Sequence, residues 1–163
     1  MLQIYTRKRI QVNVPENIAE DKSNRFTIED IQKAKNYYEE NGYVIFSKCV
    51  DLDSCDFLRN LWDTSIKQYN GAIYRQTTGK AEKNIFNENN WIMNPVLNIQ
   101  SLNPKLFNNF RENVEEKIFK NKNICSILSG FFNKKPKIIQ SMYFEGNSVT
   151  GEHQDTYYLD SEK

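Results

Sequence analysis

Residues 140–160 read QSMYFEGNSVTGEHQDTYYLD, and the interpretation of the whole chain depends on this stretch. It begins as a strand-like apolar run, passes through a polar loop that contains two glycines, and becomes strand-like again at His153. In a β-strand, side chains two residues apart point to the same side of the sheet. The imidazole of His153 and the carboxylate of Asp155 are therefore expected to project together, with Gln154 on the opposite side. One neutral nitrogen donor and one hard oxygen donor on the same face suit a first-row divalent metal such as Fe(II).

His153 and Asp155 also have simpler interpretations. A histidine close to an aspartate is often a hydrogen-bonded surface pair with no metal. General-base catalysis fits the spacing less well, because side chains two residues apart on a strand run side by side and rarely align for a hydrogen bond. The position of the pair favours a metal, since it starts a strand beside a polar loop, where a substrate can reach it.

The composition indicates a folded, nearly neutral protein. Aromatic residues make up 13% of the 163 residues, which is enough to build the core of one domain or a large part of one. The 22 Lys and Arg residues balance the 21 Asp and Glu residues. We therefore expect no nucleic-acid partner, because phosphate binding needs a clustered basic excess.

The same sequence favours a cytoplasmic location without a membrane partner. Its three cysteines show neither a disulfide framework nor a zinc-binding spacing, which fits a reducing compartment. No signal peptide is evident, and no apolar run approaches the roughly 20 residues that span a bilayer.

Periodicity predicts helices first and strands toward the end of the chain. In the polar segment 1–26, alternation predicts one short strand over residues 10–14. An amphipathic helix is expected to begin at Thr27, where Thr27 and Asp30 take the outer places of a capping box, and to end at Gly42 in the left-handed conformation. The apolar run at 43–46 then predicts a buried strand.

The remainder of the chain predicts three further helical segments and one strand. Acidic residues at 51 and 53 start a helix that ends at Gly71, and Asn103 caps another whose first residue is proline. Residues 124–131 continue as helix with Gly130 as the expected cap, and residues 140–144 are expected to form an apolar strand. Residues 72–101 read mainly as loops. This order predicts an α+β domain with its sheet in the C-terminal part.

Three segments together resemble the phytanoyl-CoA dioxygenase family. Residues 139–159 are similar to its order of strand, variable loop, His-Gln-Asp and aromatic-rich run. The helix followed by Asn-Gly-Tyr at 41–43 resembles the family's opening, and Leu-Ser-Gly at 128–130 resembles its helix-to-strand connection. The resemblance implies an α+β fold in which N-terminal helices pack on a double-stranded β-helix, a jelly-roll or cupin-like barrel that is truncated in this chain.

The resemblance also implies a function and roles for single residues. His153 and Asp155 match the first two Fe(II) ligands, Gln154 lies in the segment that approaches the cosubstrate 2-oxoglutarate, and Met142 matches a cosubstrate-contacting position on the preceding strand. Aspartate at position 155 favours hydroxylation, because halogenating relatives carry a small residue there. The implied enzyme is a dioxygenase that uses Fe(II), 2-oxoglutarate and O₂ to hydroxylate a small organic or acyl substrate.

The chain departs from the family pattern at two points. The family adds a second histidine ligand, and an arginine that pairs with the far carboxylate of 2-oxoglutarate, a task suited to the guanidinium group. This chain has one histidine, and no arginine follows Arg111. We therefore expect residues 27–163 to be the N-terminal part of a single dioxygenase domain, with 1–26 as a polar leading segment and the C-terminal strands missing. Alone, the chain is not expected to be catalytically competent.

Two alternatives remain open. The chain could be a non-catalytic binding or interaction module, or half of a split enzyme, with a complementing C-terminal chain as its partner. It could also be a different cupin-type metalloprotein in which Glu145 or Glu152 joins His153 and Asp155 as a ligand.

Overall fold

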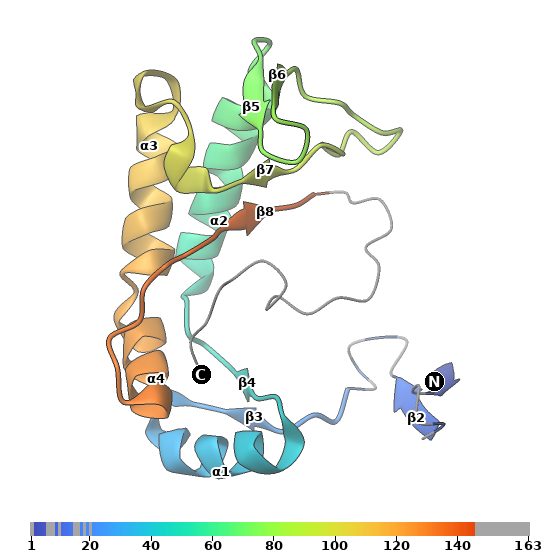
Figure 1. Ribbon diagram of the computed structural model, residues 1–163, viewed down its shortest axis with the longest axis vertical. Helices are drawn as coiled ribbons and strands as arrows, with labels where there is room; N and C mark the ends of the chain where they lie inside the picture. The colour runs from blue at the N-terminus through green and yellow to red at the C-terminus, as the bar shows by residue number, and fades with distance from the viewer. Residues whose placement is uncertain are drawn as a thin grey trace. The chain divides into compact units, whose positions relative to one another are not determined.

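The computed structural model describes residues 2–5, 9, 11–14, 17, 19 and 21–145 (Figure 1). The chain divides into two compact units. Unit 1 comprises Met1–Cys49 and Ser126–Lys134, and unit 2 comprises Val50–Cys125 and Lys135–Lys163. Within the described residues, helices combine with four separate two-stranded sheets, which confirms the α+β class. These described strands do not make up a jelly roll.

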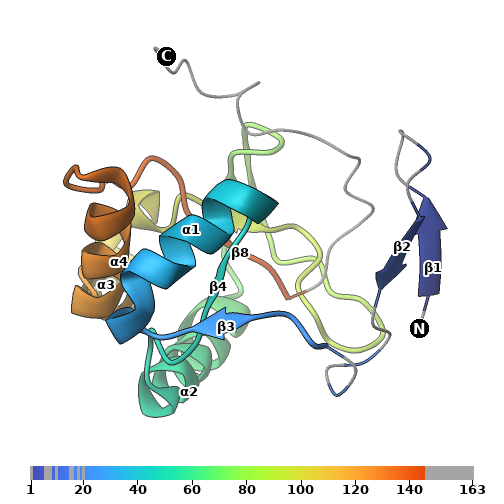
Figure 2. The same cartoon turned by 90° about the horizontal axis from the view of Figure 1, so that it is seen from below.

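Unit 1 contains two small sheets and the helix α1. Strand β1 (Leu2–Tyr5) pairs antiparallel with β2 (Gln11–Val14), so the strand predicted near residues 10–14 is present. Strand β3 (Arg25–Phe26) pairs in parallel with β4 (Ile45–Phe46), which can be followed in Figure 2. The predicted strand at 43–46 is thus shorter than expected, and its partner lies at the end of the polar segment 1–26, where only the strand at 10–14 was predicted.

The first predicted helix forms with a different start. A short 3₁₀ turn η2 (Ile28–Asp30) precedes α1 (Ile31–Asn41). The Thr27 hydroxyl donates to the Asp30 carboxylate (3.1 Å) and does not bond a backbone amide, so the expected capping box is absent. The predicted end is confirmed: Gly42 has a φ of +77° and its N–H donates to the Tyr38 carbonyl (2.8 Å).

The core of unit 1 joins α1 to the end of α4 (Lys122–Phe132). Ala34 is fully buried against Ile127 and Phe131. Gly130 lies inside α4, so its predicted role as a cap is wrong. A Cβ atom at this position would lie 3.1 Å from Cγ2 of Ile31, so the glycine permits a close helix approach.

Unit 2 is built on two long helical segments. The helix α2 (Leu52–Leu61) starts at Asp51, whose carboxylate accepts from the Ser54 N–H (2.7 Å), and it continues as the π-helix η3 (Trp62–Lys67). The helix α3 (Pro104–Val114), capped by Asn103 as predicted, continues as the π-helix η5 (Glu115–Phe119). Figure 1 shows α2 and α3 running side by side in opposite directions. Their facing side chains form the larger core, which includes Leu58, Trp62, Ile66, Phe107, Phe110 and Val114.

The segment predicted mainly as loops carries most of the strands of unit 2. Strand β5 (Ile73–Arg75) pairs antiparallel with β6 (Lys80–Glu82), and β7 (Val96–Leu97) pairs antiparallel with β8 (Met142–Tyr143). A bridge between Phe86 and Ile92 lies between β6 and β7 in the sequence. A 3₁₀ turn, η4 (Ile99–Ser101), follows β7. Strand β8 confirms the centre of the predicted strand at 140–144, whose other residues are not in a strand.

Candidate functional site

The predicted site residues fall in two parts of the chain. His153, Gln154 and Asp155 lie outside the described residues, so their assignment stays a prediction. Met142 lies on β8, eleven positions before His153 in the sequence. The described part of the site is therefore the strand that leads toward the His-Gln-Asp segment.

Met142 and Tyr143 point to opposite faces of the β7–β8 pair. Tyr143 stacks on Trp62 with ring centroids 3.9 Å apart and an interplanar angle of 15°, so this face of the pair belongs to the core. Met142 is 53% exposed and pairs in register with Leu97. The side predicted to contact a cosubstrate is thus the accessible side.

A cavity of about 300 Å³ lies next to this pair in unit 2. Leu97, the register partner of Met142, forms part of its wall together with Leu106 and Phe107, and Ser101 and Asn103 supply polar atoms. A volume of this size, with both polar and apolar groups in its lining, suits a small organic molecule.

Ser141 fixes the start of β8 to the turn that precedes α3. Its carbonyl accepts from the Asn98 N–H (2.6 Å) and its hydroxyl accepts from the Ile99 N–H (3.0 Å). The same hydroxyl donates to the Gln100 side chain (2.6 Å). These bonds involve both the backbone and the side chain of one residue, so they set the register of β8 as well as its position.

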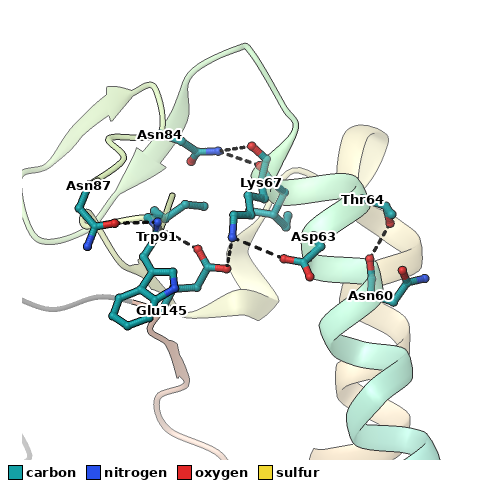
Figure 3. A network of polar contacts seen from close by, with 10 residues as sticks. Asn60, Asp63, Thr64, Lys67, Asn84, Asn87, Trp91 and Glu145 are labelled. Atoms are coloured by element: carbon teal, nitrogen blue, oxygen red, sulfur yellow. Dashed lines mark hydrogen bonds and ion pairs between the residues drawn. The ribbon is translucent and has the colours of Figure 1, made fainter. Parts of the chain in front are cut away.

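Glu145 fixes the end of the described segment (Figure 3). Its Oε1 accepts from Lys67 Nζ (2.9 Å), and its Oε2 accepts from the Ile92 N–H (2.9 Å). Lys67 also lies 3.7 Å from the Asp63 carboxylate. The ammonium group next to Glu145 repels a divalent cation, so this arrangement disfavours Glu145 as a metal ligand.

Trp91 lies beside Glu145 in Figure 3 and is 48% exposed, so it is not a core residue. Its backbone N–H donates to the Asn87 side chain (2.9 Å), which closes the 87–91 turn. The buried residue of this turn region is Ile92, whose side chain is 1% exposed and whose amide holds Glu145.

Asn84 and Arg75 form a second polar group that the sequence analysis did not identify. The Asn84 side-chain amide donates to the carbonyls of Ile66 (2.8 Å) and Lys67 (3.4 Å) at the end of η3, and its oxygen accepts from Arg75 Nη2. The sequence carries one signal for the buried arginine: Ile73 and Arg75 lie two residues apart, so on a strand they share one face, which in β5 is the buried face.

The described residues do not supply a metal centre by themselves. No group of three His, Cys, Asp or Glu side chains in this part of the chain is arranged to hold a metal ion. Over the whole sequence, the single histidine leaves the family's two-histidine ligand set incomplete. The residues present therefore do not fit a complete Fe(II) site.

No family model, curated protein or solved structure matches this chain. The functional interpretation therefore rests on the quoted sequence motifs and on the geometry above. Among the described helices, none has the length and apolar character needed to cross a bilayer.

Proposed function

We propose that this chain is part of a non-haem Fe(II)- and 2-oxoglutarate-dependent dioxygenase that hydroxylates a small organic or acyl substrate with O₂. His153 and Asp155 are its metal-ligand candidates, and Gln154 and Met142 are its candidates for contact with the cosubstrate. The observation that carries the proposal is the order of motifs from the Asn-Gly-Tyr segment to His-Gln-Asp. The anchored β8 strand, with Met142 on its accessible side and a cavity next to Leu97, is compatible with it.

The chain's own described residues have positioning roles in this proposal. Ser141, Tyr143 and Glu145 hold the strand from which the His-Gln-Asp segment continues. The third ligand and the arginine that the resemblance implies must come from another polypeptide segment, so catalysis by this chain alone is not proposed. The proposed location is the cytoplasm, with neither nucleic acid nor membrane as partner.

Chemical complementation tests the ligand assignment directly. Co(II) is added to the purified chain under anaerobic conditions, with and without imidazole as a substitute for the missing nitrogen ligand, and its visible d–d absorption is followed. We expect weak binding by the chain alone and a clear increase in affinity with imidazole. We also expect no 2-oxoglutarate decarboxylation above background by the chain alone.

His153→Ala and Asp155→Ala are the decisive variants, and Glu112→Ala, which removes an exposed carboxylate of α3, is the matched control. Loss of Co(II) binding in the first two with retention in the third supports the assignment. Equal Co(II) affinity in all four proteins removes His153 and Asp155 as ligands. Tight stoichiometric Fe(II) binding with 2-oxoglutarate turnover by this chain contradicts the incomplete site.

A second candidate, an interaction module, is favoured by exposed apolar side chains around β8. Ile138, Ile139, Met142 and Phe144 are all exposed although they lie within seven residues of one another. Such a surface is typical of a segment that another chain covers. Sedimentation of the chain and of an Ile139→Ser variant, each at several concentrations, tests this candidate. Self-association that the substitution abolishes supports the interaction module, and a monomer in both cases contradicts it.

A further inference from the structure

Arg75 is the most deeply buried charged residue among those described. Its side chain is 0% exposed, and it shares the inward face of β5 with Ile73. An arginine in a protein keeps its proton, so it cannot avoid the penalty of burial by becoming neutral. Removing such a charge from water is unfavourable by several kcal/mol unless hydrogen bonds and an opposite charge compensate it.

The compensation that the described residues provide is incomplete. Nη2 donates to the Asn84 oxygen, whereas Nε and Nη1 have no hydrogen-bond partner. Burial lowers the pKa of the Arg75 guanidinium, and the nearby Glu82 carboxylate opposes this shift in part. Glu82 forms no ion pair with Arg75, since its carboxylate is engaged by Thr78 and by Asn94 Nδ2 (3.4 Å).

The free nitrogens leave one complete binding edge on the guanidinium. Nη2 shares one edge with Nε and the other with Nη1, and it carries one N–H on each edge. Whichever of these hydrogens Asn84 accepts, the other edge keeps two parallel N–H donors. Two parallel donors match the two oxygens of a carboxylate, which is the bidentate geometry that arginine forms most strongly.

We propose that Arg75 is a binding site for a small carboxylate anion, held by this free edge. A carboxylate fits better than a phosphate, because the Glu82 charge disfavours a dianion and only one arginine edge is open. The anion enters when the β5–β6 hairpin moves, since Nε and Nη1 are enclosed in the closed form. The hairpin is suited to such motion: it pairs over only three residues, and its turn residues 77–79 are exposed.

The competing explanation is a purely structural role. In that case Arg75 acts through Asn84 on the carbonyls at the end of η3, where a positive charge is favourable. This role requires no anion, and it predicts that added carboxylate leaves the Arg75 N–H groups unchanged.

Arginine side-chain NMR separates the two explanations. The full chain, labelled with ¹⁵N and kept in EDTA so that no metal contributes, is titrated with sodium acetate, sodium succinate or sodium 2-oxoglutarate. Sodium chloride at matched ionic strength is the reference. The Nε–H signal of Arg75 is assigned by its loss in Arg75→Met. Thermal unfolding of the same samples measures how much each anion stabilises the fold. Arg59→Met, which replaces an exposed arginine of α2, is the matched control.

We expect a saturable shift of the Arg75 Nε–H signal with the carboxylates and none with chloride. The carboxylate-dependent rise in melting temperature persists in Arg59→Met and is lost, or needs at least about 10-fold more anion, in Arg75→Met. Acetate is expected to bind more tightly than the dianions succinate and 2-oxoglutarate, because the nearby Glu82 carboxylate disfavours a second negative charge. If Arg75→Met does not fold, Glu82→Gln decides, because removal of the competing charge must tighten acetate binding. No shift, an equal shift with chloride, or an unchanged acetate affinity in Glu82→Gln overturns the proposal.

Discussion

Replacement of Glu145 by glutamine tests whether the end of β8 is held by a buried ion pair. The side chains of Lys67 and Glu145 are 18% and 13% exposed and their charged atoms are 2.9 Å apart. Removal of one partner from a fully buried pair costs about 3–5 kcal/mol. The cost here is smaller, because Lys67 keeps Asp63 at 3.7 Å and glutamine can still accept from the Ile92 N–H. We expect the free energy of unfolding to fall by about 2 kcal/mol, below the fully buried case.

The assay is urea unfolding at pH 7 followed by tryptophan fluorescence, which reports on unit 2, where Trp62 and Trp91 both lie. Glu115→Gln is the matched control, since its pair with Lys120 has a similarly short distance (2.8 Å) at 54% and 61% exposure. An exposed pair of this kind contributes below about 1 kcal/mol. Equal destabilisation by Glu145→Gln and Glu115→Gln refutes the reasoning.

A double-mutant cycle isolates the pair itself. Lys67→Met leaves the Glu145 carboxylate with the hydrogen bond from the Ile92 N–H, so it is expected to destabilise unit 2 to a similar extent. Combined with Glu145→Gln, it removes both charges, and the double variant is expected to lose about 1–2 kcal/mol less than the sum of the single effects. Strict additivity shows that the two charges do not interact. Because the pair is poorly hydrated, 0.5 M NaCl should leave this coupling largely unchanged.

Three further predictions concern single positions. Gly42→Ala places a Cβ atom at a φ of +77° and should destabilise unit 1 by about 1 kcal/mol, as measured by urea unfolding, and no loss contradicts the left-handed cap. Asn103→Ala removes the bond from the Lys105 N–H (3.0 Å) and should cost about 1 kcal/mol, whereas Asn103→Asp should retain most of it. Burial, together with the nearby Glu145 and Asp63 carboxylates, raises the pKa of Tyr143. The neutral phenol therefore contributes its full stabilisation below the unfolded pKa, which is near 10, and this contribution is lost as the pH rises through the folded pKa. Stability curves from pH 8 to 11 should therefore fall less steeply in Tyr143→Phe than in the unchanged chain, and parallel curves contradict this.

Local signals predicted the helices well because their causes lie within a few residues. Asp51 and Asn103 each accept from a backbone N–H at the start of a helix, and Gly42 ends one, so short-range chemistry was sufficient. The continuation of α2 as a π-helix was not predicted, since the burial of Trp62 and Ile66 looks the same in the sequence for either helix type.

The strands of unit 2 depend on partners far away in the chain, and sequence periodicity could not find them. Strand β7 pairs with β8 across more than 40 residues, and each contributes only two residues to the ladder. The predicted strand at 140–144 was recognisable from its apolar character, but its partner was not. Glu145 shows the same limit: it was considered as a metal ligand because of its position in sequence, and its ion pair with Lys67 depends on the fold.

The division of the chain has a consequence for its synthesis. The helix α1 and strand β4 are complete by residue 46, yet the core that covers Ala34 requires Ile127 and Phe131 from the end of α4. Residues 50–125, most of unit 2, are translated between these two parts. On the ribosome, the apolar face of α1 therefore stays partly uncovered until α4 emerges, and this long sequence separation slows the assembly of unit 1. Unit 1 can thus complete its core only after Phe131 has been synthesised.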